Sequence, residues 1–161
     1  MATRQREAST NSTRERFEVR KIMSFSKATD CLNLECVGEA ISRKCQMKLT
    51  PISDRLIRVQ VQAGEKVQGG EKPQTKVPFD IRWSNNQIHM ATAKLKIIIN
   101  KYPYSLQICD AEDRELTRFK KLYFSPDFSV PDGSERTKVE FGAFSSERFV
   151  GFGEKFNSVN Q

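Results

Sequence analysis

The chain has 161 residues, which is enough for one domain with a sizeable hydrophobic core. It carries 27 basic and 20 acidic side chains, and the net charge of +7 indicates solubility or weak attraction to anions before it indicates a nucleic-acid platform. The four cysteines form no C-x-x-C pair and the only histidine is His89, so ligands for a zinc site are scarce. We therefore expect buried free thiols, no metal and no cofactor.

The N-terminal segment differs in composition from the rest of the chain. Residues 1–27 hold seven basic and three acidic side chains, are rich in Ser and Thr, and show no amphipathic stripe. We expect a disordered extension over residues 1–27 and one folded domain over residues 28–161. The segment lacks the apolar core of a secretory signal, and no stretch is apolar enough to cross a membrane. This favours a cytoplasmic or otherwise intracellular protein with no membrane partner.

Successive runs downstream alternate apolar and polar residues with a period of two, which is typical of half-buried strands. In chain order they are "CLNLEC" at residues 31–36, "RLIRVQVQ" at 55–62, "AKLKIIIN" at 93–100, "YSLQICD" at 104–110, "TKVEFGAF" at 137–144 and "RFVGFGEKF" at 148–156. In the second run, Ile57, Val59 and Val61 share one face. In the fifth, Val139 and Phe141 lie on one side. Each run therefore has a dry face and a wet face.

Four polar segments separate these runs and contain the residues that favour turns. They cover residues 63–78, 84–87, 110–115 and 125–135. The first is expected to be a mobile loop, and "SNNQ" at residues 84–87 can close a hairpin. No segment of ten or more residues has a helical period. Many short strands joined by polar turns predict an all-β protein, an antiparallel β-sandwich or barrel.

Few side chains suggest chemistry, and each has a simpler structural explanation. Adjacent Glu112 and Asp113 point apart in a polar turn, and His89 faces away from its apolar neighbours toward solvent. Lysines at 94, 96 and 101 are expected to line the solvated face of one strand. Phe119, Tyr123, Phe124 and Phe128 beside Lys120 and Lys121 could imitate a stacking platform for single-stranded nucleic acid, although a sandwich core explains these aromatic residues as well and is preferred.

The last strand-like run ends in "GFGE", which lacks the third glycine and the following helix of a dinucleotide site. In its context, "SSERFVGFGEKFNSVNQ" resembles the segment that closes the N-terminal β-sandwich of glycoside hydrolase family 31, the α-glucosidase and α-xylosidase family. The runs "RLIRVQV" and "TAKLKIIINKYPYSLQICDAEDRELTR" are similar to earlier strands of the same domain. The order and spacing of these motifs extend the resemblance from about residue 30 to residue 161.

The resemblance implies a galactose mutarotase-like supersandwich half without catalytic residues of its own. In the family, the catalytic aspartates lie on a later (β/α)8 barrel, the nucleophile in a "Trp-x-Asp-Met" type motif. Here Trp83 is followed by Ser84 and Asn85, and a barrel of about 250 residues is missing. We therefore expect a domain truncated before the barrel and inactive alone. Its implied partners are that barrel and an α-linked saccharide, with no nucleic acid.

The same resemblance assigns roles to the closing segment. Phe156 is the candidate sugar-facing platform, because an aromatic face suits the apolar face of a pyranose. Glu154 could accept hydrogen bonds from sugar hydroxyls or tie the segment to the barrel. Gly151, Phe152 and Gly153 are expected to be structural, with the glycines allowing close backbone approach. A purely architectural role for the whole segment is the competing interpretation.

Two other classes of function remain open from the sequence. A stand-alone carbohydrate-binding sandwich would bind saccharides without any barrel. A basic β-barrel could instead bind nucleic acid through its lysine-lined strand, with an affinity that falls steeply with salt.

Overall fold

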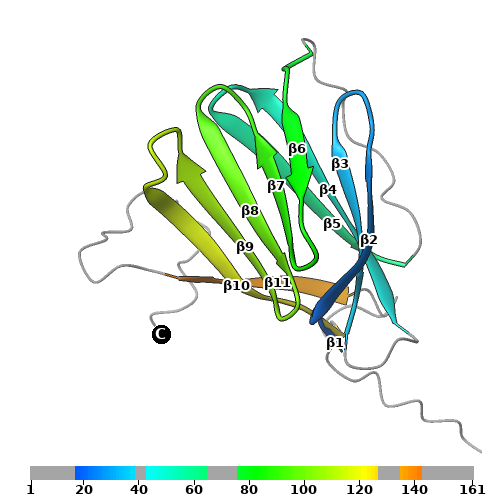
Figure 1. The fold of residues 1–161 in the computed structure, drawn as a ribbon. Helices are drawn as coiled ribbons and strands as arrows, with labels where there is room; N and C mark the ends of the chain where they lie inside the picture. Colours follow the sequence, from blue (N-terminus) through cyan, green and yellow to red (C-terminus); the bar gives the residue numbers. More distant parts are fainter. Residues whose placement is uncertain (1–16, 39–42, 65–75, 127–134, 143–161) are drawn as a thin grey trace, which may run out of the picture.

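The computed structural model describes residues 17–38, 43–64, 76–126 and 135–142 of the chain. Within these ranges every regular element is a strand, and every strand pair is antiparallel. The strands form two sheets that face one another (Figure 1). This arrangement confirms the predicted all-β antiparallel sandwich. Among the described residues, no helix is long and apolar enough to cross a membrane.

The smaller sheet consists of four strands in sequence order, each pairing with the next. They are β2 (Lys21–Lys27), β3 (Leu32–Val37), β4 (Lys44–Ser53) and β5 (Leu56–Ala63). In β3, Leu32 and Leu34 are fully buried. In β5, Ile57, Val59 and Val61 pack against the same core, as the period-two pattern predicts.

The larger sheet contains the other seven strands. In spatial order they are β1 (Phe17–Glu18), β10 (Glu115–Pro126), β9 (Tyr104–Asp110), β8 (Leu95–Lys101), β7 (Gln87–Ala91) and β6 (Asp80–Trp83), with β11 (Glu135–Gly142) also paired to β10. The "SNNQ" segment does close the hairpin from β6 to β7, with the Ser84 amide donating to the Gln87 carbonyl at 2.9 Å.

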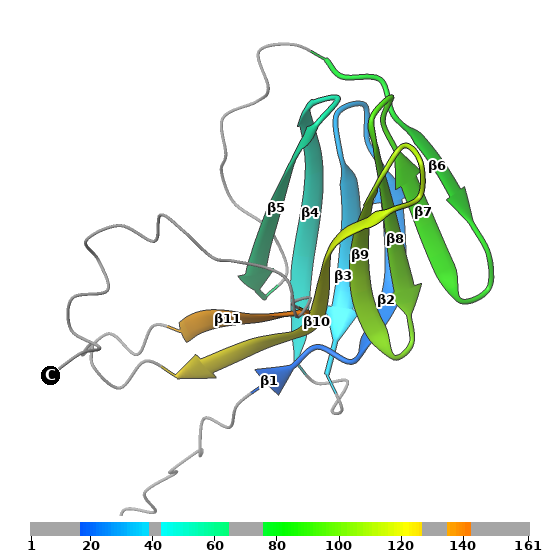
Figure 2. The ribbon, with the colours of Figure 1, turned by 90° about the vertical axis from the view of Figure 1, so that its left-hand side faces the viewer.

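β10 has three neighbours because it is 12 residues long. β9 pairs with its first part, and β11 pairs with it from residue 118 to residue 126. Because β11 pairs with one side of β10, β1 pairs with the other side, the same side as β9 but further along β10. Figure 2 shows the far part of β10, with β11, running out beyond the two packed sheets. β11 then runs back along β10, so the last described residue, Gly142, pairs with Arg118 where β10 lies beside β9.

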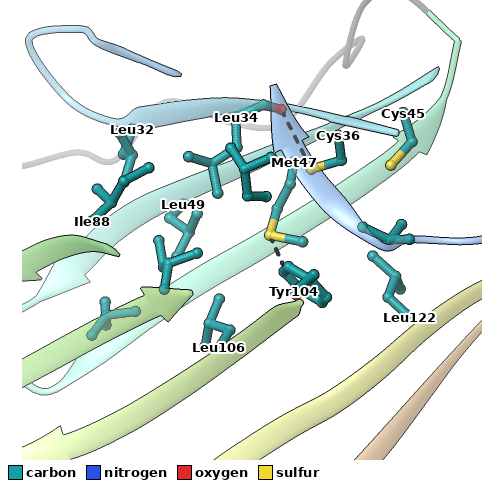
Figure 3. Close-up of a cluster of buried hydrophobic side chains, with 14 of the residues drawn as sticks. Leu32, Leu34, Cys36, Cys45, Met47, Leu49, Ile88, Tyr104, Leu106 and Leu122 are labelled. Atoms are coloured by element: carbon teal, nitrogen blue, oxygen red, sulfur yellow. Dashed lines mark hydrogen bonds between the residues drawn. The ribbon is translucent and has the colours of Figure 1, made fainter. Parts of the chain in front are cut away.

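Side chains from both sheets meet in one buried cluster (Figure 3). In the larger sheet, Ile88, Ile99 and Leu106 are direct partners across three strands and are fully buried. Across the interface, the Tyr104 hydroxyl donates a hydrogen bond to the Met47 sulfur at 3.9 Å. Burying one large apolar side chain contributes about 1.5–3 kcal/mol, so this interlocked layer holds the two sheets together.

The prediction of a disordered segment over residues 1–27 is wrong for residues 17–27, while residues 1–16 lie outside the described part. Phe17 in β1 is buried, and its ring lies 5.8 Å from that of Phe124. Ile22 in β2 is also buried and pairs with Cys36. These few apolar residues provide the burial that stabilises the strands, while their charged neighbours stay in solvent.

Candidate functional site

The residues predicted to face a sugar lie outside the described part of the chain. Phe156 and Glu154, with the structural motif Gly151, Phe152 and Gly153, belong to residues 143–161. Their roles stay predictions. The structure does describe the strand that leads to them, which ends 14 residues before Phe156 at Gly142.

β11 is anchored to β10 by side-chain contacts as well as by the strand ladder. The Phe141 ring packs edge-on against Phe119, with centroids 4.7 Å apart and planes at 79°. The Tyr123 hydroxyl donates to Glu140 at 3.3 Å, and Val139 packs against the core. The prediction that Val139 and Phe141 share one side is confirmed, although Phe141 is 53% exposed. The hairpin thus fixes the point from which the candidate segment departs.

The outer face of the larger sheet carries a row of polar side chains that crosses three strands. His89 and Gln87, both on β7, contact through the imidazole Nε2 and the amide Oε1 at 3.1 Å. Gln87 Nε2 donates to Asn100 Oδ1 at 2.9 Å, and Asn100 Nδ2 donates to Ser105 Oγ at 2.7 Å. His89 does face away from the core, as predicted, but this row leaves it half-buried. No cluster of three or more potential metal ligands occurs among the described residues.

The predicted polar turn at residues 110–115 is present and does not form an acid–base pair. Glu112 contacts Arg114 at 3.7 Å, whereas Asp113 contacts Lys96 at 2.7 Å. Burial would raise the pKa of Asp110, but hydrogen bonds from the Arg114 amide and guanidinium outweigh it and lower the pKa. Arg114 therefore pairs with both Asp110 and Glu112, while Asp113 pairs with Lys96.

All four cysteines are buried and free, as predicted. Burial raises the pKa of the Cys31 and Cys109 thiols. For Cys36, the hydrogen bond with Cys45 and burial together raise the pKa far above its usual range. A raised pKa keeps a thiol protonated and a poor nucleophile, so Cys31, Cys36 and Cys109 act as core packing.

The expectation that three lysines line one solvated strand face is wrong for Lys101. Lys96 lies on the outer face of β8, where it pairs with Asp113. Lys101 instead lies on the same face as the buried residues Ile97 and Ile99, and its ammonium group donates to the Ser84 carbonyl at 2.8 Å. It also lies 5.5 Å from the Phe25 ring of the smaller sheet. The lysine stripe that a nucleic-acid binder would need is therefore split between two faces.

The aromatic residues around Lys120 and Lys121 could have formed a stacking platform or part of the core, and the structure supports the preferred core role. Phe119 packs against the core, and Tyr123 and Phe124 are buried. Phe128 lies outside the described residues.

One surface feature was not predicted from the sequence. A pocket of about 590 Å³ lies beside β10 and is lined by cations, amides and an exposed tyrosine, including Arg20, Asn100, Tyr102, Arg118, Lys120 and Lys121. The "KYPY" and "RFKK" segments that provide most of these residues are 14 residues apart in sequence. Only the pairing of β9 with β10 brings them together.

Comparisons with known proteins agree with the fold. No curated protein sequence matches the chain. The cycloalternan-forming enzyme from Listeria monocytogenes, solved with a pentasaccharide substrate, matches with a TM-score of 0.62 at 18% identity over 68% of this chain and 10% of its own. A structure of an uncharacterised protein from the same organism, with glucose, magnesium and calcium, matches with a TM-score of 0.60 at 17% identity over the same shares.

A dextranase of glycoside hydrolase family 31 from Flavobacterium johnsoniae also matches, with a TM-score of 0.47 at 19% identity over 62% of this chain and 13% of its own. At these identities the two Listeria structures show the fold alone, and the chain spans about a tenth of the length of those proteins. The family model for the glycosyl hydrolase 31 N-terminal galactose mutarotase-like domain covers residues 46–161. That match includes well over half of the chain, which therefore belongs to this family of non-catalytic N-terminal domains.

Proposed function

We propose that this domain supports the catalytic (β/α)8 barrel of an α-glycosidase and forms part of the wall of its sugar pocket. The family match over residues 46–161 is the observation that carries the proposal. In this role the domain contributes no acid, base or nucleophile. The buried cysteines and the ion-paired carboxylates of the 110–115 turn are consistent with that division of labour.

The segment after Gly142 is the proposed link to the sugar. β11 ends at Gly142, which pairs with Arg118 of β10, so the chain leaves this hairpin at the end next to β9 and not at the end that projects beyond the packed sheets (Figure 2). From there Phe156 would present an aromatic face to a pyranose ring, and Glu154 would accept hydrogen bonds from its hydroxyls. Gly151 and Gly153 would let the backbone approach a neighbouring domain closely.

The test is a hydrolysis assay of two chains from one reading frame, with nitrophenyl α-glucoside and α-xyloside as substrates. We expect residues 1–161 alone to release no nitrophenol. A longer chain that continues in frame through a barrel-length region with a Trp-x-Asp motif is expected to be active. Inhibitor-sensitive turnover by the 161-residue chain would overturn the proposed division of labour, as would an unrelated sequence beyond residue 161.

A further inference from the structure

We propose that the basic pocket beside β10 binds a saccharide that carries an anionic group, namely a carboxylate, sulfate or phosphate. Its volume of about 590 Å³ lies in the range of pockets that hold small ligands. The proposal rests on residues of this pocket and does not depend on the proposed support of a barrel.

The pocket is positively charged because four cations and one carboxylate line it. Arg20 pairs with Glu18 at 3.4 Å, and Arg118 donates to a carboxylate outside the lining. Lys120 and Lys121 have no ion-pair or hydrogen-bond partner among the described residues. Two ammonium groups therefore remain to bind an anionic ligand.

A β-bulge explains why both lysines line the pocket. Phe119 and Leu122 both contribute to the core, although they are three residues apart and regular alternation would place them on opposite faces. The register of β10 against β11 shifts between Phe119 and Lys121. The extra residue returns Leu122 to the core and excludes both intervening lysines from it. Bulges commonly re-aim side chains in this way beside functional sites.

Neutral groups that also line the pocket suit the hydroxyls and ring of a sugar. Asn100 donates one of its two side-chain N–H groups to Ser105. The hydroxyl hydrogen of Ser105 has no acceptor among the described residues. Asn86 adds an exposed amide. The Tyr102 ring is 62% exposed and offers an apolar face that a pyranose can cover. Cations, hydroxyl-binding groups and one aromatic ring together match a sugar acid or a sugar ester.

Single-stranded nucleic acid fits this surface less well. Sequence-tolerant binding of a strand needs several aromatic platforms along a basic groove. The aromatic residues next to Lys120 and Lys121 are instead packed into or against the core, which leaves Tyr102 as the exposed ring of the pocket.

The experiment is an NMR titration of the 161-residue chain with D-glucuronic acid and with D-glucose 6-phosphate, followed at the side-chain amides of Asn86 and Asn100. D-Glucose and inorganic phosphate are titrated separately as the neutral and the sugar-free probes. We expect saturable shifts with both anionic sugars and about tenfold weaker binding by the double variant Lys120→Gln/Lys121→Gln. The matched control Lys76→Gln/Lys94→Gln removes the same charge elsewhere and should bind as the original chain does.

Three outcomes would overturn the proposal. The first is the absence of saturable shifts with either anionic sugar. The second is an equal loss of affinity in both double variants, because that would assign binding to net charge rather than to the pocket. The third is binding of inorganic phosphate as tightly as glucose 6-phosphate, because the sugar ring would then contribute nothing. Tyr102→Ala provides an independent check, since it should weaken the binding of anionic sugars while leaving that of inorganic phosphate unchanged.

Discussion

Truncation of Ile99 tests whether the row of buried side chains across β7, β8 and β9 holds the sandwich together. Ile99 is fully buried between its strand partners Ile88 and Leu106. Replacing it with alanine removes three carbon groups, worth about 0.8 kcal/mol each, and leaves a cavity. We expect Ile99→Ala to lower the free energy of unfolding by about 3 kcal/mol, and Ile99→Val by about 1 kcal/mol.

The neighbouring residue Ile98 is the matched control on the same strand. It lies on the opposite face, half-buried, between His89 and Gln107 of the adjacent strands. Because that face is partly solvated, Ile98→Ala should cost about 1 kcal/mol or less.

Urea unfolding followed by circular dichroism gives the free energies of unfolding. The slope of the free energy against urea concentration should be the same for all variants. For a chain of this length, a loss of about 3 kcal/mol corresponds to a melting temperature about 6–12 °C lower. If Ile99→Ala does not fold, the comparison of Ile99→Val with Ile98→Val decides. A cost at Ile98 equal to or larger than that at Ile99 would refute the assignment of inner and outer faces.

The remaining predictions concern the projecting hairpin, acid stability, the thiols and the sugar-facing segment. A double-mutant cycle of Phe119→Leu and Phe141→Leu should give a coupling energy of about 0.5–1.5 kcal/mol in urea unfolding, and a value near zero would mean that the ring contact does not anchor β11. Hydrogen bonds from Lys44 and Ser24 lower the pKa of Glu35 below its ordinary 4.5, so its stabilising effect is complete above that pH and lost as the pH falls through the lowered value. Glu35→Gln should therefore flatten the decline of unfolding free energy below about pH 4.5, and an unchanged slope would contradict this. A thiol reagent should label the native chain slowly and all four cysteines after unfolding in urea, whereas rapid native labelling would mean that they are not buried. In a chain that includes the barrel, Phe156→Ala should raise KM about tenfold for an α-linked saccharide, and an unchanged KM would leave the residue with an architectural role.

The alternating runs predict β3, β5, β8, β9 and β11 and their inward faces, because a half-buried strand has a period of two whatever its partner is. Ile57, Val59 and Val61 follow this rule. It fails at Lys101, where a long flexible side chain takes an inner position at the end of β8 and extends its ammonium group to the Ser84 carbonyl. The runs also miss β1, whose two residues show no period, and they miss β2, β4 and β10; in β10 the bulge after Phe119 interrupts the alternation.

For the candidate sites, the sequence and the structure supply different parts. The motif around Gly151 and Gly153 resembles the family and contains the sugar-facing candidates. It can be read from the sequence because its residues are contiguous. The basic pocket has no local motif, because Arg20 and Tyr102 are brought to Lys120 and Lys121 by the ladders that β10 forms with β1 and β9.

By itself the sequence determined an all-β chain, buried cysteines, a hairpin at residues 84–87 and membership of a glycosidase domain family. These depend on short-range patterns, namely alternation, turn residues and motif spacing. Only the tertiary structure decided which strands share a sheet and that residues 17–27 belong to the fold. It also showed that a bulge keeps Lys120 and Lys121 out of the core, where both line one pocket. Alternation fixes the face on which a side chain lies, whereas the choice of partner strand depends on contacts between segments far apart in the chain.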